Sequence, residues 1–146
     1  MAQPKEDIGT RKDLCLYRIQ TARDNLKAAK ILLAAEEYKS ANNRSYYAIF
    51  QAVNAVHGLN GDAFKRHKDA IGNFNKNYVK TEIFSREIGR KIGEAEEIRH
   101  ASDYDDFYIA SREESERQIE VADEFIELVE KYCEERMRAE AVENKE

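Results

Sequence analysis

Apolar residues recur at steps of three and four along most of this chain, the spacing of one face of an α-helix. The pattern predicts five helices. The first is predicted from Arg11 to Glu37, and its stripe is Ile19, Ala22, Leu26, Ala29 and Leu33. The only proline, Pro4, lies in the N-terminal tail, so no proline interrupts the chain after it. Long unbroken helices are therefore permitted.

The middle of the chain predicts three further helices. Ser40 is a candidate cap for the second, whose stripe is Tyr46, Phe50, Val53 and either Val56 or His57. Gly58 and Gly61 predict a break at residues 58–62. The third helix is predicted from His67 to Tyr78, with Ile71 and Phe74 also inward. Thr81 or Ser85 caps the fourth, where Ile88, Ile92 and Ala95 repeat, and residues 102–110 are expected to be irregular.

The last helix begins at a capping-box pattern, Ser111-x-x-Glu114. Its stripe is Ile119, Ala122, Ile126, Val129 and Cys133, and a second set, Val121, Phe125, Leu128 and Tyr132, lies beside it. A stripe this broad needs two neighbouring helices, or one neighbour and a partner chain, which motivates a homodimer hypothesis. Past Cys133 the stripe gives way to charge, so residues 136–146 are expected to fray or be disordered.

These elements predict an all-α fold, an up-and-down bundle of four to five helices. The predicted organisation is a tail over residues 1–10, one helical domain over 11–135 and a charged tail over 136–146. The chain has 146 residues, which suits a single domain. No apolar run is long enough to span a membrane and the N-terminus has no signal-peptide core, so we expect a cytoplasmic protein with no membrane partner.

The composition and motifs of the chain exclude several kinds of protein and site. A net charge of −5 argues against a general nucleic-acid coat protein, although it leaves room for a local basic cleft. The two cysteines are too far apart in sequence to indicate a disulfide framework or a metal site. Glu97-x-x-His100 has the spacing used in di-metal bundles but occurs only once, so we expect no metal. No phosphate-binding glycine loop is present, and we expect no cofactor.

Arg99 occupies the next inward position of the fourth stripe, after Ile88, Ile92 and Ala95. Two interpretations are open. In one, Arg99 forms a salt bridge at the helix end with Asp103 or Glu96, which lie four and three residues away. In the other, Asp103 holds Arg99 in a cleft where the guanidinium meets a phosphate, because an arginine is rarely buried without a partner.

Two other groups of residues are candidates for binding a nucleotide. Arg44 and Tyr47 share one helix face and together can bind a phosphate and stack on a base, or else Tyr47 is an interface aromatic. The run Lys65-Arg66-His67-Lys68 is the only compact basic cluster, and it opens the third helix. It is either an anion site or an ordinary solvated patch.

Several short stretches, taken in order, resemble the HEPN-domain family (higher eukaryotes and prokaryotes nucleotide-binding), especially its small stand-alone bacterial and archaeal members. They are Tyr17-Arg18-Ile19 through Asp24-Asn25-Leu26-Lys27-Ala28-Ala29-Lys30, Asn43-Arg44-Ser45-Tyr46-Tyr47-Ala48-Ile49-Phe50, His67-Lys68, Phe74, Tyr78-Val79-Lys80-Thr81, Arg99-x-x-x-Asp103-Tyr104 and Ala122-x-x-Phe125-Ile126. The resemblance covers roughly residues 14–132, nearly the whole chain. It implies a helical bundle, dimers with a shared cleft and, in some members, a partner minimal nucleotidyltransferase that neutralises a toxin.

The resemblance also implies metal-independent RNase chemistry from a motif of an arginine, four to six intervening residues and then a histidine. Arg99 matches that arginine, but Tyr104 stands where the histidine is first expected, and no histidine follows His100. The resemblance therefore leaves three hypotheses. The first is a nucleotide- or RNA-binding module with Arg99, Asp103 and Tyr104 in the cleft, and with Arg44, Tyr47, His67 and Lys68 as further binding residues. The second is an active RNase or toxin with a variant site, using His67 or His100. The third is a structural interaction protein.

Overall fold

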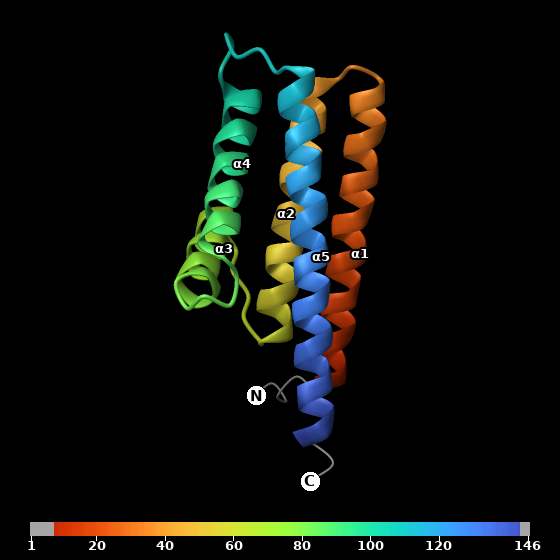
Figure 1. Cartoon of the computed structure of the whole chain (residues 1–146), viewed down its shortest axis with the longest axis vertical. Coiled ribbons are helices and arrows are strands. Elements are labelled where there is room, and N and C mark those ends of the chain that lie inside the picture. Colours follow the sequence, from red (N-terminus) through yellow and green to blue (C-terminus); the bar gives the residue numbers. More distant parts are fainter. Residues whose placement is uncertain (1–7, 144–146) are drawn as a thin grey trace.

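The structure, a computed structural model, describes residues 8–143 (Figure 1). The elements in chain order are α1 (Ile8–Ala34), α2 (Tyr38–Leu59), α3 (His67–Phe74), a single turn of π-helix η1 (Asn75–Val79), α4 (Arg86–Tyr104) and α5 (Arg112–Glu143). The predicted all-α bundle is confirmed within this range. Figure 1 shows α1, α2 and α5 running side by side, with α4 along one edge and α3 beside the beginning of α4.

The central helix of the bundle is α2, which packs against α1, α3, α4 and α5. A helix with this many neighbours is buried over most of its surface, and α2 fits its neighbours closely because many of its buried residues are small. Four alanines, at positions 41, 48, 52 and 55, are fully buried. The same helix carries Tyr46 and Tyr47, so the core of the fold directly positions the residues of the candidate site.

The predicted stripes are buried as expected. Their fully or nearly fully buried members include Ile19, Ala22, Leu26, Ala29, Val53, Val56, His57, Ile71, Phe74, Ile88, Ile92, Ala95, Ile119, Ala122, Ile126, Val129 and Cys133. The broad stripe of α5 finds its neighbours within the same chain, because α5 packs against both α1 and α2. Val121 and Phe125 are buried there and only Leu128 is exposed. The breadth of this stripe therefore no longer calls for a partner chain.

Two predicted caps are present. Ser85 Oγ accepts a hydrogen bond from Ile88 N at 3.1 Å, and Ser111 Oγ accepts one from Glu114 N, also at 3.1 Å. The carboxylate of Glu114 accepts a hydrogen bond from buried Asn42 of α2 at 3.4 Å. Each of these serines satisfies a backbone donor that the first turn of a helix otherwise leaves unpaired.

Several predicted boundaries differ from the structure: α1, for instance, spans Ile8–Ala34 and not Arg11 to Glu37. Ser40 does not cap α2, which already begins at Tyr38. The break predicted at residues 58–62 is present, but the helix first passes through Gly58 to Leu59, and the turn comes at Gly61, whose φ is +85°. A Cβ at position 58 would lie 2.9 Å from Arg18 Nη1, so Gly58 serves the close approach of α1 rather than a break.

At the other ends, α4 and α5 run further than predicted. Helix α4 continues to Tyr104, into the segment expected to be irregular, and only residues 105–111 form the connection to α5. Helix α5 continues to Glu143, past the expected boundary at residue 135, and Met137 still packs against the core. Residues 144–146, like the predicted N-terminal tail up to residue 7, lie outside the described residues. Over residues 8–143, no helix has both the length and the apolar character required to cross a membrane.

His57 gives the fold a predicted pH dependence. Its side chain is fully buried, Nε2 donates to Ala70 O at 2.9 Å, and Nδ1 has no partner among the described residues. Burial lowers the pKa of His57 below its ordinary 6.5, and this effect outweighs the hydrogen bond to Ala70. As pH falls below about 6.5 the unfolded chain therefore takes up a proton that the folded chain resists, so stability falls.

We expect the free energy of unfolding to drop by on the order of 1 kcal/mol from this group between about pH 7.5 and about pH 5.5. Urea denaturation at the two pH values measures the difference. His57→Gln, whose amide can still donate to Ala70 O, should flatten the dependence, whereas His100→Gln removes an exposed imidazole and should not. Equal slopes in the wild type and in His57→Gln would show that His57 is not responsible.

Candidate functional site

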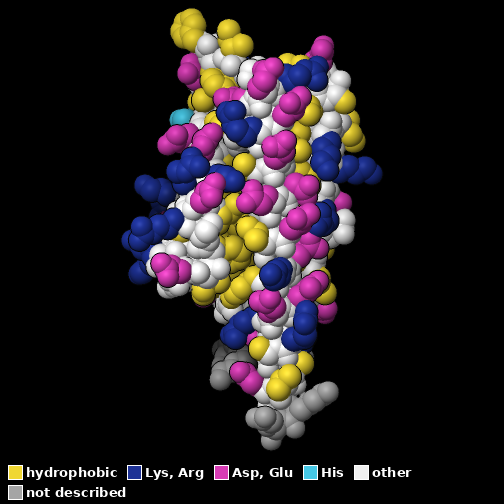
Figure 2. All heavy atoms as spheres, in the orientation of Figure 1, with side chains coloured by type: hydrophobic (Ala, Val, Ile, Leu, Met, Phe, Trp, Pro, Cys, Tyr) yellow, Lys and Arg dark blue, Asp and Glu magenta, His cyan; other side chains and the backbone are white. Residues whose placement is uncertain are grey.

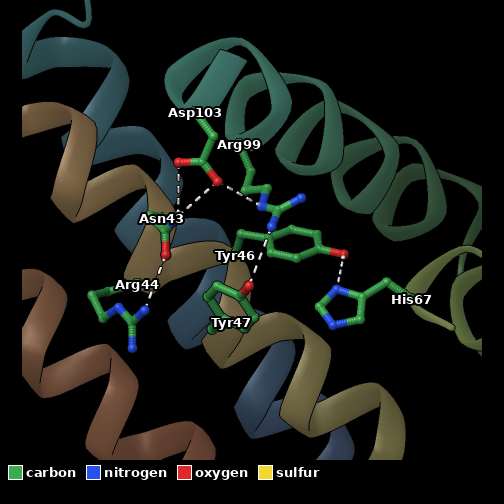
Figure 3. Close-up of polar contacts among 7 residues, drawn as sticks. All are labelled: Asn43, Arg44, Tyr46, Tyr47, His67, Arg99 and Asp103. Carbon is green, nitrogen blue, oxygen red and sulfur yellow. Dashed lines mark hydrogen bonds and ion pairs between the residues drawn. The ribbon is translucent and has the colours of Figure 1, made fainter. Parts of the chain in front are cut away.

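The candidate site lies where the first half of α2 faces the last turns of α4, with the start of α3 beside them (Figure 3). The site contains a pocket of about 610 Å³. It is larger than the pocket of about 310 Å³ between α4 and α5. The lining of the larger pocket includes Tyr46 from α2, His67 and Lys68 from α3, and Arg99 and His100 from α4. The structure thus brings together residues more than fifty positions apart in sequence.

Arg99 is held by residues of both helices. Its Nε lies 3.1 Å from Asp103 Oδ2, and its Nη2 donates to Tyr47 Oη at 3.2 Å. The contact with Asp103 is electrostatic, because Nε lacks an aligned hydrogen-bond acceptor among the described residues. The guanidinium carbon also lies 5.5 Å from the centre of the Tyr46 ring and 5.7 Å from that of Tyr47. The predicted ion pair with Asp103 is therefore present, and Arg99 also lines a pocket, whereas a contact with phosphate stays a prediction.

Asp103 connects Arg99 to Arg44 through Asn43. Asn43 Nδ2 donates to both carboxylate oxygens of Asp103, at 3.0 and 3.1 Å, and Asn43 Oδ1 accepts from Arg44 Nη2 at 3.1 Å. Figure 3 shows this chain of contacts running from Arg44 to Arg99. Because the asparagine binds a carboxylate with its amide nitrogen and a cation with its oxygen, its orientation is fixed. Arg44 and Tyr47, predicted as a pair, do interact, with the guanidinium 5.0 Å from the ring centre.

His67 is packed among aromatic rings at the floor of the same pocket. Its imidazole stacks on Phe50 with 3.8 Å between ring centres, and Nδ1 lies 3.3 Å from Tyr46 Oη. Burial and, secondly, the charge of Arg99 lower the pKa of His67 below its ordinary 6.5. Burial, followed by the nearby carboxylate of Glu96, raises the pKa of Tyr46 to about 12. At neutral pH the pocket therefore holds an uncharged imidazole next to a protonated phenol.

The charges that line the pocket are of both signs. Arg99 and Lys68 are cations, while Glu96, Glu97 and Asp105 carry carboxylates. The two cations are outnumbered by three carboxylates, so the site is not a broad basic surface. Figure 2 shows side chains of both signs over the visible face, where acidic ones predominate along α5 and basic ones gather at the edge near α3.

Two of the three predicted cleft residues, Asp103 and Tyr104, are not among the residues that line this pocket, and neither are the predicted binding residues Arg44 and Tyr47. Tyr104 is 66% exposed, and its ring packs against His100 with 4.9 Å between centres. In turn, several residues of the site were not among the predicted site residues, including Asn43, Tyr46 and Glu96. Tyr46 was assigned to the core, where it does lie, but its hydroxyl reaches His67. Asn43 directly precedes Arg44 in the sequence. Its position next to a predicted binding residue was the one sequence feature that could have indicated its role. Over residues 8–143, no group of three or more His, Cys, Asp or Glu side chains is arranged to hold a metal ion.

Comparisons with known proteins agree with this architecture. The HEPN domain model matches residues 16–132. A UPF0332 protein of Thermotoga maritima is 34% identical over 84% of this chain and 93% of its own length. Two proteins of Methanocaldococcus jannaschii named "Putative toxin", MJ0142 and MJ0605, are 30% and 32% identical, over 78% and 77% of this chain and 78% and 84% of their own lengths.

A solved crystal structure, that of TT1696 from Thermus thermophilus, shares the fold with a TM-score of 0.67. It is 18% identical, and the match covers 80% of this chain and 96% of that one. The family model spans most of the described residues, including every helix that contributes to the pocket. The chain therefore belongs to the HEPN-domain family.

Proposed function

We propose that this protein is a nucleotide- or RNA-binding HEPN module whose ligand occupies the pocket at Arg99. The observation that supports this most is the way in which Arg99 is held. Tyr47 and Asp103 fix one side of the guanidinium, and the residue lines a 610 Å³ pocket beside an uncharged His67. A pre-oriented arginine in a pocket binds a phosphate with little loss of side-chain entropy.

The rest of the pocket suits the other parts of a nucleotide. Lys68 supplies a second cation at its edge. The imidazole of half-buried His67 or exposed His100 offers a flat face on which a base can stack. Glu96 and Glu97 carry carboxylates that can accept hydrogen bonds from the amino group of a base. The same carboxylates repel a long duplex, so we expect a nucleotide or an unpaired strand to be preferred.

Binding can be tested on the wild-type protein by titration with AMP, GMP and a single-stranded RNA, followed by ¹H–¹⁵N NMR. The proposal expects saturable shifts at the amides of His67, Lys68, Arg99 and His100, and none along the exposed face of α5. No saturation at millimolar ligand, or shifts confined to residues away from the pocket, would overturn it. The measurement needs no substitution, so loss of folding cannot imitate a negative result.

RNA cleavage is the second candidate function, and the position of His67 favours it. The chain lacks the histidine that the family places after its arginine, yet His67 lines the same pocket as Arg99. Neutral His67 has a basic Nε2 when its Nδ1 proton is shared with Tyr46. It would take the proton of a 2′-hydroxyl as that oxygen bonds to phosphorus and the P–O5′ bond breaks. The departing 5′-oxygen takes a proton from water, and Arg99 meets the charge on phosphate.

For this candidate we expect RNA cleavage in EDTA by the wild type and a loss of about 100-fold in rate in His67→Ala. His100→Ala removes the other pocket histidine and is the matched comparison, expected to keep most of the rate. Gel analysis of a labelled single-stranded RNA measures both. If the wild type cuts and His100→Ala, not His67→Ala, abolishes cutting, then His67 is not the base. If the wild type binds RNA without cutting it, the binding function stands alone.

We further propose a toxin-like role in the cytoplasm, as a homodimer or with a minimal nucleotidyltransferase as partner. The support is the similarity to the two proteins named as toxins and the exposed apolar side chains of the α4–α5 connection. Phe107 is 93% exposed and Ile109 is 88% exposed, and hydrophobic side chains project from this connection in Figure 2. A growth defect on expression tests the role, and light scattering of the purified protein tests the dimer. A monomer at high concentration would exclude the homodimer.

A further inference from the structure

A second pocket adjoins the first on the other side of the contact between Asn43 and Asp103. It has a volume of about 350 Å³, and its polar lining residues are Lys39, Ser40, Asn43, Arg44, Ser102 and Asp103. Asp103 lines this pocket, whereas its ion-pair partner Arg99, 3.1 Å away, lines the first. The two pockets are therefore neighbours, with one member of this ion pair in the lining of each.

The partners of Arg44 are all uncharged. Nη1 donates to Asn25 Oδ1 at 3.2 Å, Nη2 donates to Asn43 Oδ1 at 3.1 Å, and the guanidinium lies over the Tyr47 ring. Among the described residues no carboxylate lies within ion-pair distance of Arg44, in contrast to Arg99. Neutral amides and an aromatic ring orient this cation but leave its charge uncompensated. A half-buried arginine in this state is suited to an external anion.

Lys39 and Ser40 add two further groups for an anion on the same wall. Both are exposed, and because α2 begins at Tyr38, the Ser40 hydroxyl is not used as the helix cap. Ser102 Oγ, on the opposite wall, has no hydrogen-bond partner among the described residues. The one carboxylate in the pocket, that of Asp103, is already engaged by Arg99 and by Asn43. The charges of Lys39 and Arg44 are thus not neutralised by a carboxylate in the described part of the chain, whereas the charge of Asp103 is neutralised by Arg99.

We infer that the pocket at Lys39, Ser40 and Arg44 is a second phosphate subsite, and that the ligand is a single-stranded polynucleotide with at least two phosphates bound at once. This inference rests on the proposed function, because the first subsite is the pocket at Arg99. One phosphate binds at Arg99, a neighbouring one binds at Arg44, and the strand crosses the ridge formed by Asn43 and Asp103. A mononucleotide fills only one of the two subsites.

The test compares a mononucleotide with a tetranucleotide RNA on the whole protein, at several salt concentrations. Lys39→Gln is the main variant, because Lys39 is exposed and its removal leaves the core intact. Lys80→Gln, an exposed lysine after η1, is its matched control for net charge. Arg44→Gln is the second variant, and its folding is checked by thermal melting. A tetradeoxynucleotide shows whether the 2′-hydroxyl contributes or whether any phosphodiester strand suffices.

We expect the wild type to bind the tetranucleotide more tightly than the mononucleotide. Lys39→Gln should weaken only the tetranucleotide, by roughly two- to fivefold, and lower the salt slope of its binding by about 0.7. Arg44→Gln should weaken the tetranucleotide by about tenfold or more and leave the mononucleotide within about twofold. Lys80→Gln should change neither.

Equal affinities of the wild type for the two ligands, with no effect of Lys39→Gln or Arg44→Gln, would overturn the second subsite while leaving the first in place. Equal weakening by Lys39→Gln and Lys80→Gln would also overturn it, since that result indicates a diffuse effect of charge. If the wild type binds neither ligand, the proposed function itself fails, and the inference fails with it.

Discussion

Phe125→Ala is expected to lower the free energy of unfolding by about 3–5 kcal/mol, the usual cost of removing a fully buried phenylalanine ring. Phe125 of α5 is 0% exposed and packs between Phe74 of α3 and Phe84 of the η1–α4 connection. The ring centres lie 5.6 and 5.9 Å apart, respectively. Removing this ring leaves a cavity between α5 and the segment that follows His67, so the transfer free energy of the ring and its packing contacts are both lost.

Chemical denaturation monitored by circular dichroism measures this effect. Phe125→Leu fills most of the same volume and is the control, expected to cost about 1–2 kcal/mol. The midpoint should shift without a change in slope if the folded state keeps its compactness. A loss below about 1 kcal/mol for Phe125→Ala would mean that the rings around Phe125 can collapse into the cavity, and that this cluster is not tightly packed.

Arg99→Ala is expected to weaken nucleotide binding by roughly 10- to 100-fold, because a charge-assisted hydrogen bond contributes about 1.5–3 kcal/mol. Its effect on stability should be small, under about 1 kcal/mol, since Asp103 is partly exposed and keeps its contacts with Asn43. This separation of a large binding effect from a small folding effect distinguishes a binding arginine from a purely structural one. Calorimetric titration and thermal melting of the same samples measure the two quantities.

Two further variants sharpen the result. Arg99→Lys keeps the charge but loses the forked donor geometry, so its affinity should be intermediate. Arg90→Ala removes an exposed arginine of the same helix, which pairs with Glu94 outside the pocket, and should bind like the wild type. Similar losses in Arg90→Ala and Arg99→Ala would mean that the ligand responds to overall charge and not to this site. A large loss of stability with no binding in any variant would instead support the structural hypothesis.

The helices were predictable because their signal is local. A three–four repeat of apolar residues depends only on the helical period, and the stripes through Ile19, Ile88 and Ile126 are buried as predicted. The helix ends were less predictable, because they depend on contacts with other elements. Gly58 was predicted to begin the break, but α2 continues through Gly58 to Leu59, and α1 packs closely against this glycine. Asp-rich residues after Ser102 read as irregular, yet α4 continues through Asp103, which binds Asn43 of α2.

The site was predictable only where the residues in contact lie close together in the sequence. Arg99 and Asp103 lie four residues apart and meet as a helix pair should. Tyr104 lies five residues from Arg99, which places it about 140° further round the helix and away from the pocket. The contact of Arg99 with Tyr47 and the entry of His67 into the same pocket join three helices. No periodic pattern in one segment carries that information.

The central place of α2 has a consequence for motion. Helix α2 packs against four other elements and also forms one wall of both pockets, so it cannot shift to admit a ligand without disturbing the core. The opposite walls come from α3 and from the end of α4, and α4 makes little contact with α5. Opening and closing of the pocket should therefore be a hinge-like displacement of the α3–η1–α4 segment against a fixed three-helix frame. In this protein the rigid part and the adaptable part of the binding site belong to different halves of the bundle.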